Sequence, residues 1–361
     1  MEAIISYTVY NSIVLSPILL LLVRSKRMKA LMPIVYYICL AFIITLVSTR
    51  FQVGRDFSNY ERIFTEISSE EFERMEIGFR SLILSLNQLG LESQWLFFVT
   101  ACIIYSCVFK SYYKIKSALF IIIWFLVFFL PSLNQLRQYM ALAVLTLALI
   151  HFEERKKYIF LVIIATSFHY TGLVGFIYLI LAKLRFRWSW LLLLVSPIFI
   201  YINLPKLILS LGLLGDVYYA FYLTDENIYA GMQTLSLGGI TRLVLPFLFV
   251  FLYRKDNRPF ITLIKNSMIA YVCLYFLSIN FYILYRIYIM FMLLLPFAAY
   301  IIYTEYRGGI RLAVLGYTLI LFLLFQKSIS DQTIEPANGN SIYPYQTIFN
   351  DYIIRIGRKY D

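Results

Sequence analysis

Long segments without polar side chains constrain this sequence more than any other feature. Leu119–Leu130 consists of Leu, Phe, Ile, Trp and Val alone, and Leu191–Ile202 is almost as apolar. Neither segment alternates apolar with polar residues, as a strand of a membrane barrel would. Segments that are apolar on every face form helices in lipid, where each backbone polar group must be paired within its own segment. With 14% charged residues and a mean hydropathy of +0.76, the sequence predicts an all-α, polytopic integral membrane protein.

The hydropathy profile predicts about twelve transmembrane helices, since each crossing needs about 20 apolar residues. Their approximate positions are 4–23, 31–49, 95–109, 117–133, 138–152, 158–168, 170–182, 188–204, 240–253, 261–279, 286–303 and 312–326. We expect residues 1–326 to form a single transmembrane domain, with outer loops at 50–94 and 205–239 and an outer tail at 327–361. Residues 158–184 form either one long tilted helix or two short helices hinged at 168–172.

The positions of the basic residues favour two short helices there. With two helices, one side of the membrane gathers 18 of the 32 basic residues but only four of the 20 acidic residues. Its loops are 24–29, 110–116, 153–157, 183–187, 254–258 and 305–311. Basic loops mark the cytoplasmic side of a membrane protein, so both termini and the longer loops are predicted to lie outside. The net charge of +12 is therefore a topology signal. No nucleic-acid motif accompanies it, so we expect membrane lipids and no nucleic acid as partners.

Several function classes lack their usual residues. The four cysteines lie apart within apolar segments, so the sequence predicts neither a disulfide framework nor a metal site. No glycine-rich nucleotide-binding loop occurs, which argues against ATP-driven transport. We therefore expect no metal and no other cofactor.

Charged residues at the outer ends of the predicted helices are the candidates for a functional site. A charge at the centre of a membrane helix costs ~2.5 to 3.5 kcal/mol, so such residues are functional candidates by default. The candidates are Arg50, Arg55, Asp56, Glu76, Arg137, His169, Arg242 and Arg286. The inner basic loops alone determined the topology, yet all of these residues fall on the outer side. This coincidence predicts a site at the outer face.

These residue types suit a phosphate-bearing substrate. A guanidinium keeps its charge and offers two parallel hydrogen bonds to phosphate oxygens. Arg137 and Arg286 begin predicted helices, where a diphosphate at headgroup depth would lie. His169 can accept a proton from a hydroxyl near neutral pH. We predict these three residues as catalytic, and nearby tyrosines such as Tyr139 and Tyr285 could stack on sugar rings.

The candidates also have structural interpretations. Arg50 could extend its side chain toward the outer headgroups. His169 could be a hinge residue capped by backbone groups. Asp56 and Glu76 could hold the outer loop by pairing with nearby arginines, which are Arg50, Arg55 and Arg80. The other histidine, His151, adjoins an inner charged loop and is predicted to lie at the membrane edge.

Five short motifs, taken together, resemble those of a known membrane protein family. They are Arg50 with Val53-Gly54-Arg55-Asp56 and Tyr60; Glu76-Ile77-Gly78-Phe79; Asn134-Gln135-Leu136-Arg137-Gln138, followed by an alanine-rich helix; Ser167-Phe168-His169; and Tyr343-Pro344-Tyr345. In order and spacing this set resembles the EpsG-like branch of the Wzy-type polysaccharide polymerases. The resemblance extends over nearly the whole chain.

The resemblance implies a metal-independent glycosyltransferase of the bacterial cytoplasmic (inner) membrane, with its active site on the periplasmic, extracytoplasmic face. Such an enzyme transfers an undecaprenyl-diphosphate-linked glycan onto another lipid-linked repeat unit, in O-antigen, capsule or exopolysaccharide synthesis. It implies a fold similar to the GT-C-type lipid-linked-sugar transferases, and a chain-length-regulating membrane protein is a candidate partner. The catalytic residues would be His169, Arg137 and Arg286. The substrate-binding residues would be Arg50, Arg55, Asp56, Tyr60, Glu76, Asn134, Gln135, Gln138, Tyr139, Arg242 and Tyr285.

Two other functions stay open at this point. A lipid-linked oligosaccharide flippase or transporter would also have many helices and arginines, but its polar residues should extend through the helices at mid-depth. A membrane acyltransferase that modifies glycans would also use histidine and arginine. Its basic, histidine-containing motif at the first helix is absent, because residues 1–23 contain neither His nor Arg.

Overall fold

The computed structural model describes residues 2–22, 29–185, 188–204, 207, 235–334 and 342–349. Over these ranges the chain forms helices and connecting segments, together with one isolated bridge between Arg50 and Thr347. The all-α prediction is therefore confirmed. Parts of the predicted loops lie outside the described residues. They are residues 24–28 of the first basic loop, most of the predicted outer loop 205–239, and residues 335–341 and 350–361 of the predicted tail.

The chain divides into two compact units, which are residues 1–173 with 321–361, and residues 174–320. The helices of unit 1 are α1 (Glu2–Leu15), η1 (Ser16–Ile18), α2 (Leu19–Leu22), η2 (Lys29–Leu31), α3 (Met32–Ser48), α4 (Phe57–Thr65), α5 (Glu70–Glu73), α6 (Ile77–Gln88), α7 (Gln94–Ile115), α8 (Ala118–Ser132), α9 (Leu136–Ile150), α10 (Arg155–Phe168) and η3 (Tyr170–Leu173). Those of unit 2 are α11 (Val174–Leu181), α12 (Leu191–Val195), η4 (Ser196–Tyr201), α14 (Leu237–Leu252), α15 (Pro259–Ser278), η7 (Tyr282–Leu284), α16 (Tyr285–Met292) and α17 (Leu295–Glu305). The unit boundary falls within α18 (Gly309–Ile334).

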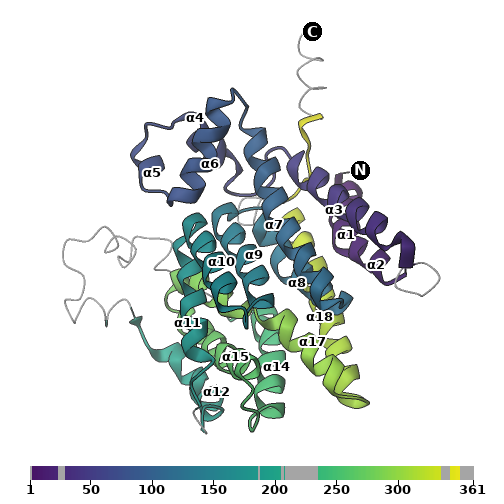
Figure 1. Cartoon of the computed structure of the whole chain (residues 1–361), viewed down its shortest axis with the longest axis vertical. Helices are drawn as coiled ribbons and strands as arrows, with labels where there is room; N and C mark the ends of the chain where they lie inside the picture. The colour runs from purple at the N-terminus through teal and green to yellow at the C-terminus, as the bar shows by residue number, and fades with distance from the viewer. Residues whose placement is uncertain are drawn as a thin grey trace. The chain divides into compact units, whose positions relative to one another are not determined.

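Helix α9 forms the centre of unit 1. It packs against α7 and α10 (Figure 1), and every residue from Gln138 to Leu149 is buried. Alanines at 141, 143 and 148 allow the neighbouring helix backbones to approach closely. Because α9 is enclosed over its length, polar residues at its first turn are held in fixed positions at one end of the unit.

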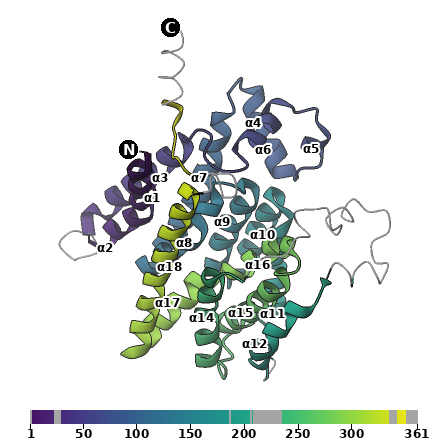
Figure 2. The ribbon, with the colours of Figure 1, turned by 180° about the vertical axis from the view of Figure 1, so that it is seen from behind.

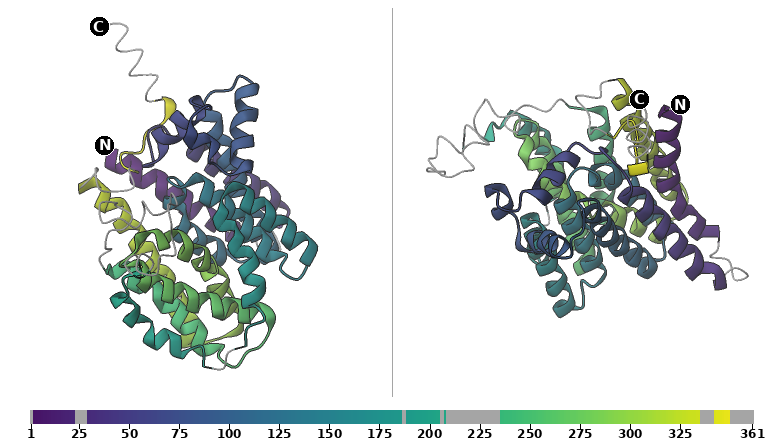
Figure 3. Two further views of the ribbon diagram at one scale, coloured as in Figure 1. Left: turned by 90° about the vertical axis from the view of Figure 1, so that its left-hand side faces the viewer. Right: turned by 90° about the horizontal axis from the view of Figure 1, so that it is seen from above.

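The predicted outer loop 50–94 forms the short helices α4, α5 and α6, which make a small lobe of unit 1 (Figures 1 and 3). The lobe is amphipathic. Phe64, Phe72 and Phe79 are buried, while charged residues cover the other side. Phe57 stacks on Phe97 of α7 with ring centroids 4.3 Å apart, which fixes the start of the lobe against the helical bundle.

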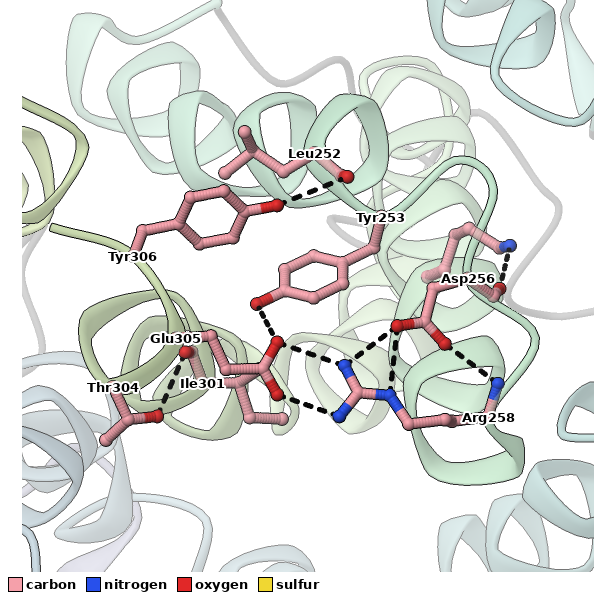
Figure 4. Close-up of polar contacts among 9 residues, drawn as sticks. Leu252, Tyr253, Asp256, Arg258, Ile301, Thr304, Glu305 and Tyr306 are labelled. Atoms are coloured by element: carbon pink, nitrogen blue, oxygen red, sulfur yellow. Dashed lines mark hydrogen bonds and ion pairs between the residues drawn. The ribbon is translucent and has the colours of Figure 1, made fainter.

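Unit 2 is organised around α15, which packs against α11, α14, α16 and η4 (Figure 2). At one end of this unit, the Arg258 guanidinium bonds the carboxylates of both Asp256 and Glu305 (Figure 4). The Tyr253 hydroxyl donates to Glu305 at 2.9 Å. The network ties the α14–α15 connection to the end of α17. The sequence assigns these two segments to the same side of the membrane, and which side that is stays a prediction.

Four of the described helical segments are long and apolar enough to cross a membrane, and they are Gln94–Ile115, Pro259–Ser278, Tyr282–Glu305 and Gly309–Ser330. Other apolar helices of 10–17 residues accompany them. The protein is therefore a membrane protein by its helices, and the number of twelve crossings stays a prediction. The expected interruption after residue 168 is present, because α10 ends at Phe168 and His169 has extended backbone angles, φ −160° and ψ 134°.

Candidate functional site

A buried carboxylate joins the predicted site residues of unit 1. Glu76 precedes the first turn of α6 and is only 4% exposed. One carboxylate oxygen, Oε2, accepts a hydrogen bond from Nη1 of Arg137 at 2.7 Å. The other, Oε1, accepts the backbone N–H of Tyr170 at 3.2 Å and lies 4.0 Å from Nε2 of His169. A carboxylate is tolerated in such a buried place because it is paired and hydrogen-bonded.

The pairing differs from the structural alternative suggested by the sequence. The sequence suggests an ion pair of Glu76 with Arg50, Arg55 or Arg80 that stabilises the outer loop. In the structure, the ion-pair partner of Glu76 is Arg137 of α9. The pair therefore connects the lobe to the central helix of unit 1. Removing either side chain would leave a charge in a largely enclosed place, which is more costly than the loss of an exposed ion pair.

Two glycines bring the separate motifs together. A Cβ on Gly78 would lie 2.7 Å from the carbonyl oxygen of Ser167, so only glycine lets the start of α6 approach the end of α10 this closely. Gly54, with φ +107°, lies against the backbone of Leu133 in the same way. The Oδ1 atom of Asn134 accepts the backbone N–H of Arg55 at 2.8 Å. Glycines and an asparagine therefore explain why motifs far apart in the sequence meet.

Arg137 lies at the first turn of α9 with its side chain 28% exposed. Its guanidinium also hydrogen-bonds the Tyr60 side chain and lies 6.0 Å from the centre of the Phe79 ring. Burial raises the pKa of Tyr60 above its ordinary value, and the charge of Arg137 partly opposes that rise. Tyr60 therefore stays a neutral hydroxyl near neutral pH.

His169 connects α10 to η3 and has a side chain that is 14% exposed. Its Nδ1 atom lies 2.8 Å from the Thr171 hydroxyl oxygen and accepts the backbone N–H of Thr171 at 3.2 Å. Thr171 carries no signal of its own in the sequence. Its position two residues after a histidine at a helix end is the feature that could have identified it.

Arg50 is 1% exposed, so the interpretation as a side chain extended toward headgroups is wrong. Its guanidinium lies 5.3 Å from the centre of the Phe97 ring. Within the described part of the chain, Nε and Nη1 of Arg50 have no hydrogen-bond partner. Its neighbours Thr49 and Phe51 bond the backbone of residues 346–348, so the Tyr343-Pro344-Tyr345 motif is held against the end of α3.

The remaining predicted residues of unit 1 differ in exposure. Arg55 is exposed and Asp56 is partly buried at the start of α4. Asn134 and Gln138 are buried, and Tyr139 is fully enclosed in α9. Gln135 has a buried side-chain oxygen that no described residue bonds. Asn134 thus has a demonstrated role in joining two motifs.

Arg242, Tyr285 and Arg286 belong to unit 2. Tyr271, Tyr275, Tyr288 and Tyr317 lie close enough to Arg242 for its charge to act on them. Nε of Arg242 is buried and bonds none of the described residues. The Tyr282 and Tyr285 rings are stacked 5.8 Å apart. The structure therefore gathers Arg242 with four tyrosines, and one of them, Tyr288, also contacts the Tyr285 ring. The predicted meeting of Arg286 with Arg137 and His169 stays a prediction.

No group of three or more His, Cys, Asp or Glu side chains in the described ranges could hold a metal ion. The groups that the structure brings together in unit 1 are a guanidinium, a carboxylate, an imidazole and two hydroxyls. This set can bind an anion and transfer a proton. It offers hydrogen bonds and charge to a bound anion.

Comparison with known proteins identifies the family. The model of the EpsG family matches residues 33–347, which include every site residue named above. No curated protein and no solved structure matches the chain. The chain therefore belongs to the EpsG family, as its motifs suggest, and is a glycosyltransferase-like membrane protein of polysaccharide biosynthesis. The expected similarity to GT-C-type transferases stays a prediction.

Proposed function

We propose that this member of the EpsG family polymerises lipid-linked oligosaccharide repeat units. It would transfer an undecaprenyl-diphosphate-linked glycan onto another lipid-linked unit at the outer face of the bacterial cytoplasmic membrane, without a metal ion. The observation that carries this proposal is the meeting of three separate motifs at Glu76, with Arg137 on one carboxylate oxygen and His169 near the other.

The reaction needs two things from the protein. A hydroxyl of the acceptor sugar attacks the anomeric carbon of the donor, so a base must receive the hydroxyl proton. The bond between that carbon and the diphosphate breaks, so the developing negative charge must be stabilised. Preorganised donors aimed at developing charge are the strongest single aid that a site of this kind supplies.

Arg137 supports the second requirement. One of its terminal nitrogens holds Glu76 and the side chain is 28% exposed, so the remaining donors of the planar guanidinium can meet a phosphate group. Arg50 adds a positive charge inside unit 1, where a low dielectric strengthens its field. We assign the diphosphate to Arg137 and the proton transfer to His169.

The residues of unit 2 supply further contacts in this proposal. Arg242 and Arg286 are cationic, and the stacked Tyr282 and Tyr285 rings offer an aromatic surface of the kind that packs on sugar rings. We assign Arg286 to the diphosphate, and Arg242 and Tyr285 to the lipid-linked glycan. O-antigen, capsule and exopolysaccharide synthesis all use this chemistry.

The test compares lipid-linked products in cells that lack the gene and carry either the parental chain or an Arg137→Lys variant. A polymerase defect leaves single repeat units attached to their normal acceptor at the outer face. A flippase defect leaves no repeat units there at all, and an acyltransferase defect leaves chains of normal length. Single units in the Arg137→Lys cells support the proposal, and either of the other two patterns would overturn it.

A further inference from the structure

The hydrogen bonds around His169 determine which of its ring nitrogens carries the proton. In a neutral imidazole one nitrogen donates and the other accepts. The backbone N–H of Thr171 points to Nδ1 at 3.2 Å, and a backbone N–H can only donate. Nδ1 is therefore the acceptor, and the proton of the neutral ring is on Nε2.

The protonated nitrogen faces a carboxylate. Nε2 lies 4.0 Å from Oε1 of Glu76, and that oxygen is held in place by the Tyr170 N–H at 3.2 Å. The second oxygen of Glu76 is held by Arg137 at 2.7 Å. A carboxylate at this distance stabilises the imidazolium more than the neutral ring. Glu76 thus prepares His169 to receive a proton at Nδ1.

A hydroxyl lies at that accepting nitrogen. The Thr171 oxygen is 2.8 Å from Nδ1, within hydrogen-bond distance, so its O–H can donate to the ring. A hydroxyl that donates one hydrogen bond still has two lone pairs with which to accept another. Thr171 is half-buried. Its hydroxyl is therefore the group within hydrogen-bond distance of the accepting nitrogen of His169.

We propose that Thr171 relays the proton of the acceptor sugar to Nδ1 of His169, with Glu76 as the positioning residue behind the ring. This role depends on the proposed polymerase function and identifies how its base works.

The step balances without any further reactant. The acceptor hydroxyl gives its proton to the Thr171 oxygen as its lone pair forms the bond to the anomeric carbon. The Thr171 proton moves to Nδ1, and the bond from the anomeric carbon to the diphosphate breaks with its electron pair leaving on the diphosphate. Thr171 is again a hydroxyl at the end of the step, and the imidazolium is paired with Glu76.

The first experiment measures polymerisation rates of the purified full-length chain with a lipid-linked repeat unit. Thr171→Val keeps the shape of the side chain but removes the hydroxyl, and we expect a loss of about 100-fold in kcat, near the lower bound for proton-transfer catalysis. Thr171→Ser keeps the hydroxyl and should stay within about threefold of the parental rate. Thr166→Val is the matched control, since the Thr166 hydroxyl bonds only the Val162 carbonyl within α10.

The second experiment tests Glu76 through the pH dependence of the same reaction. Glu76 lies within ion-pair distance of the His169 ring, and Arg137 is bonded to Glu76. Because a carboxylate beside the ring favours the imidazolium, Glu76→Gln should move the acid limb of the kcat profile to lower pH. Glu76→Asp should restore the limb in part. A purely structural role would lower the rate without moving the limb.

The outcomes separate the two proposals. If the parental chain forms no polymer from lipid-linked units, the polymerase function itself is wrong. If the parental chain and Thr166→Val polymerise and Thr171→Val does so at the same rate, only the relay is wrong. Should Thr171→Val fail to fold, Thr171→Ala against Thr171→Ser makes the same comparison, and equal rates in that pair overturn the relay.

Discussion

Replacing Gly78 by alanine should slow polymerisation in a chain that still folds. The added Cβ would lie 2.4 Å from the hydroxyl oxygen of Ser167 and 2.7 Å from its carbonyl oxygen. The hydroxyl can rotate away, but the carbonyl is backbone. An ordinary contact needs about 3.4 Å, so the start of α6 must move by about 0.7 Å from the end of α10.

That movement acts on the two contacts that define the site. Glu76 lies two residues before Gly78, and His169 lies two residues after Ser167. A displacement of this size between reacting groups costs up to about 100-fold in rate. Overpacking of this kind costs about 1–3 kcal/mol of stability. We expect a chain that still folds, melts at a lower temperature and polymerises about 10- to 100-fold more slowly.

The assay is the length distribution of the lipid-linked product over time, together with thermal unfolding in detergent. Gly316→Ala is the control, because a Cβ there meets nothing within 4 Å. Ser167→Ala combined with Gly78→Ala should not rescue the rate, since the carbonyl conflict persists. If Gly78→Ala polymerises and melts as the parental chain does, the close approach does not position Glu76 and the reasoning fails.

Three further predictions follow from other parts of the structure. His169→Ala should leave the chain folded but slow polymerisation by about 10² to 10⁴ in rate. His151→Ala removes a contact to Glu154 at the other end of α9 and should give the parental length distribution of lipid-linked product. Partial burial works to raise the pKa of Asp256, but the hydrogen bonds and charge of Arg258 outweigh it, so the pKa is lowered from 3.8. The pair should therefore stabilise the fold at a pH above 3.8, and this stability should be lost as the pH falls through the lowered pKa. The melting temperature of Asp256→Asn should lack this acid-dependent part. A cysteine placed at Lys255 in intact cells should not react with an impermeant reagent, and labelling there would contradict the topology with His169 and Arg137 outside.

Several residues that the sequence singles out do meet in unit 1, but the sequence does not predict how they pair. The glycine of the motif around Arg55 lies against the residues just before α9, and the glycine of the motif around Glu76 lies against the end of α10, because such close approaches require glycine. The partner of Glu76 could not be predicted, because several arginines lie nearer to it in sequence than Arg137 does. Which arginine it meets depends on how α6 packs against α9 and α10.

The sequence pattern also does not predict which side chains are buried. In a membrane protein an apolar segment has the same composition whether it faces lipid or other helices. The burial of Arg50 and the enclosure of Tyr139 in α9 therefore required the structure. The same ambiguity affects the number of crossings, since only four described segments have the length and hydropathy of a full span.

The most direct test of the central claim uses the purified full-length chain, reconstituted in vesicles, with a lipid-diphosphate-linked repeat unit and no nucleotide or added metal. The account predicts a ladder of lipid-linked products that grows by whole repeat units with the parental chain. With Arg137→Lys it predicts only the starting unit, since a compact ammonium cannot reproduce the two-point contact of a guanidinium. An unchanged single unit with the folded parental chain, or an equal ladder with Arg137→Lys, would contradict it.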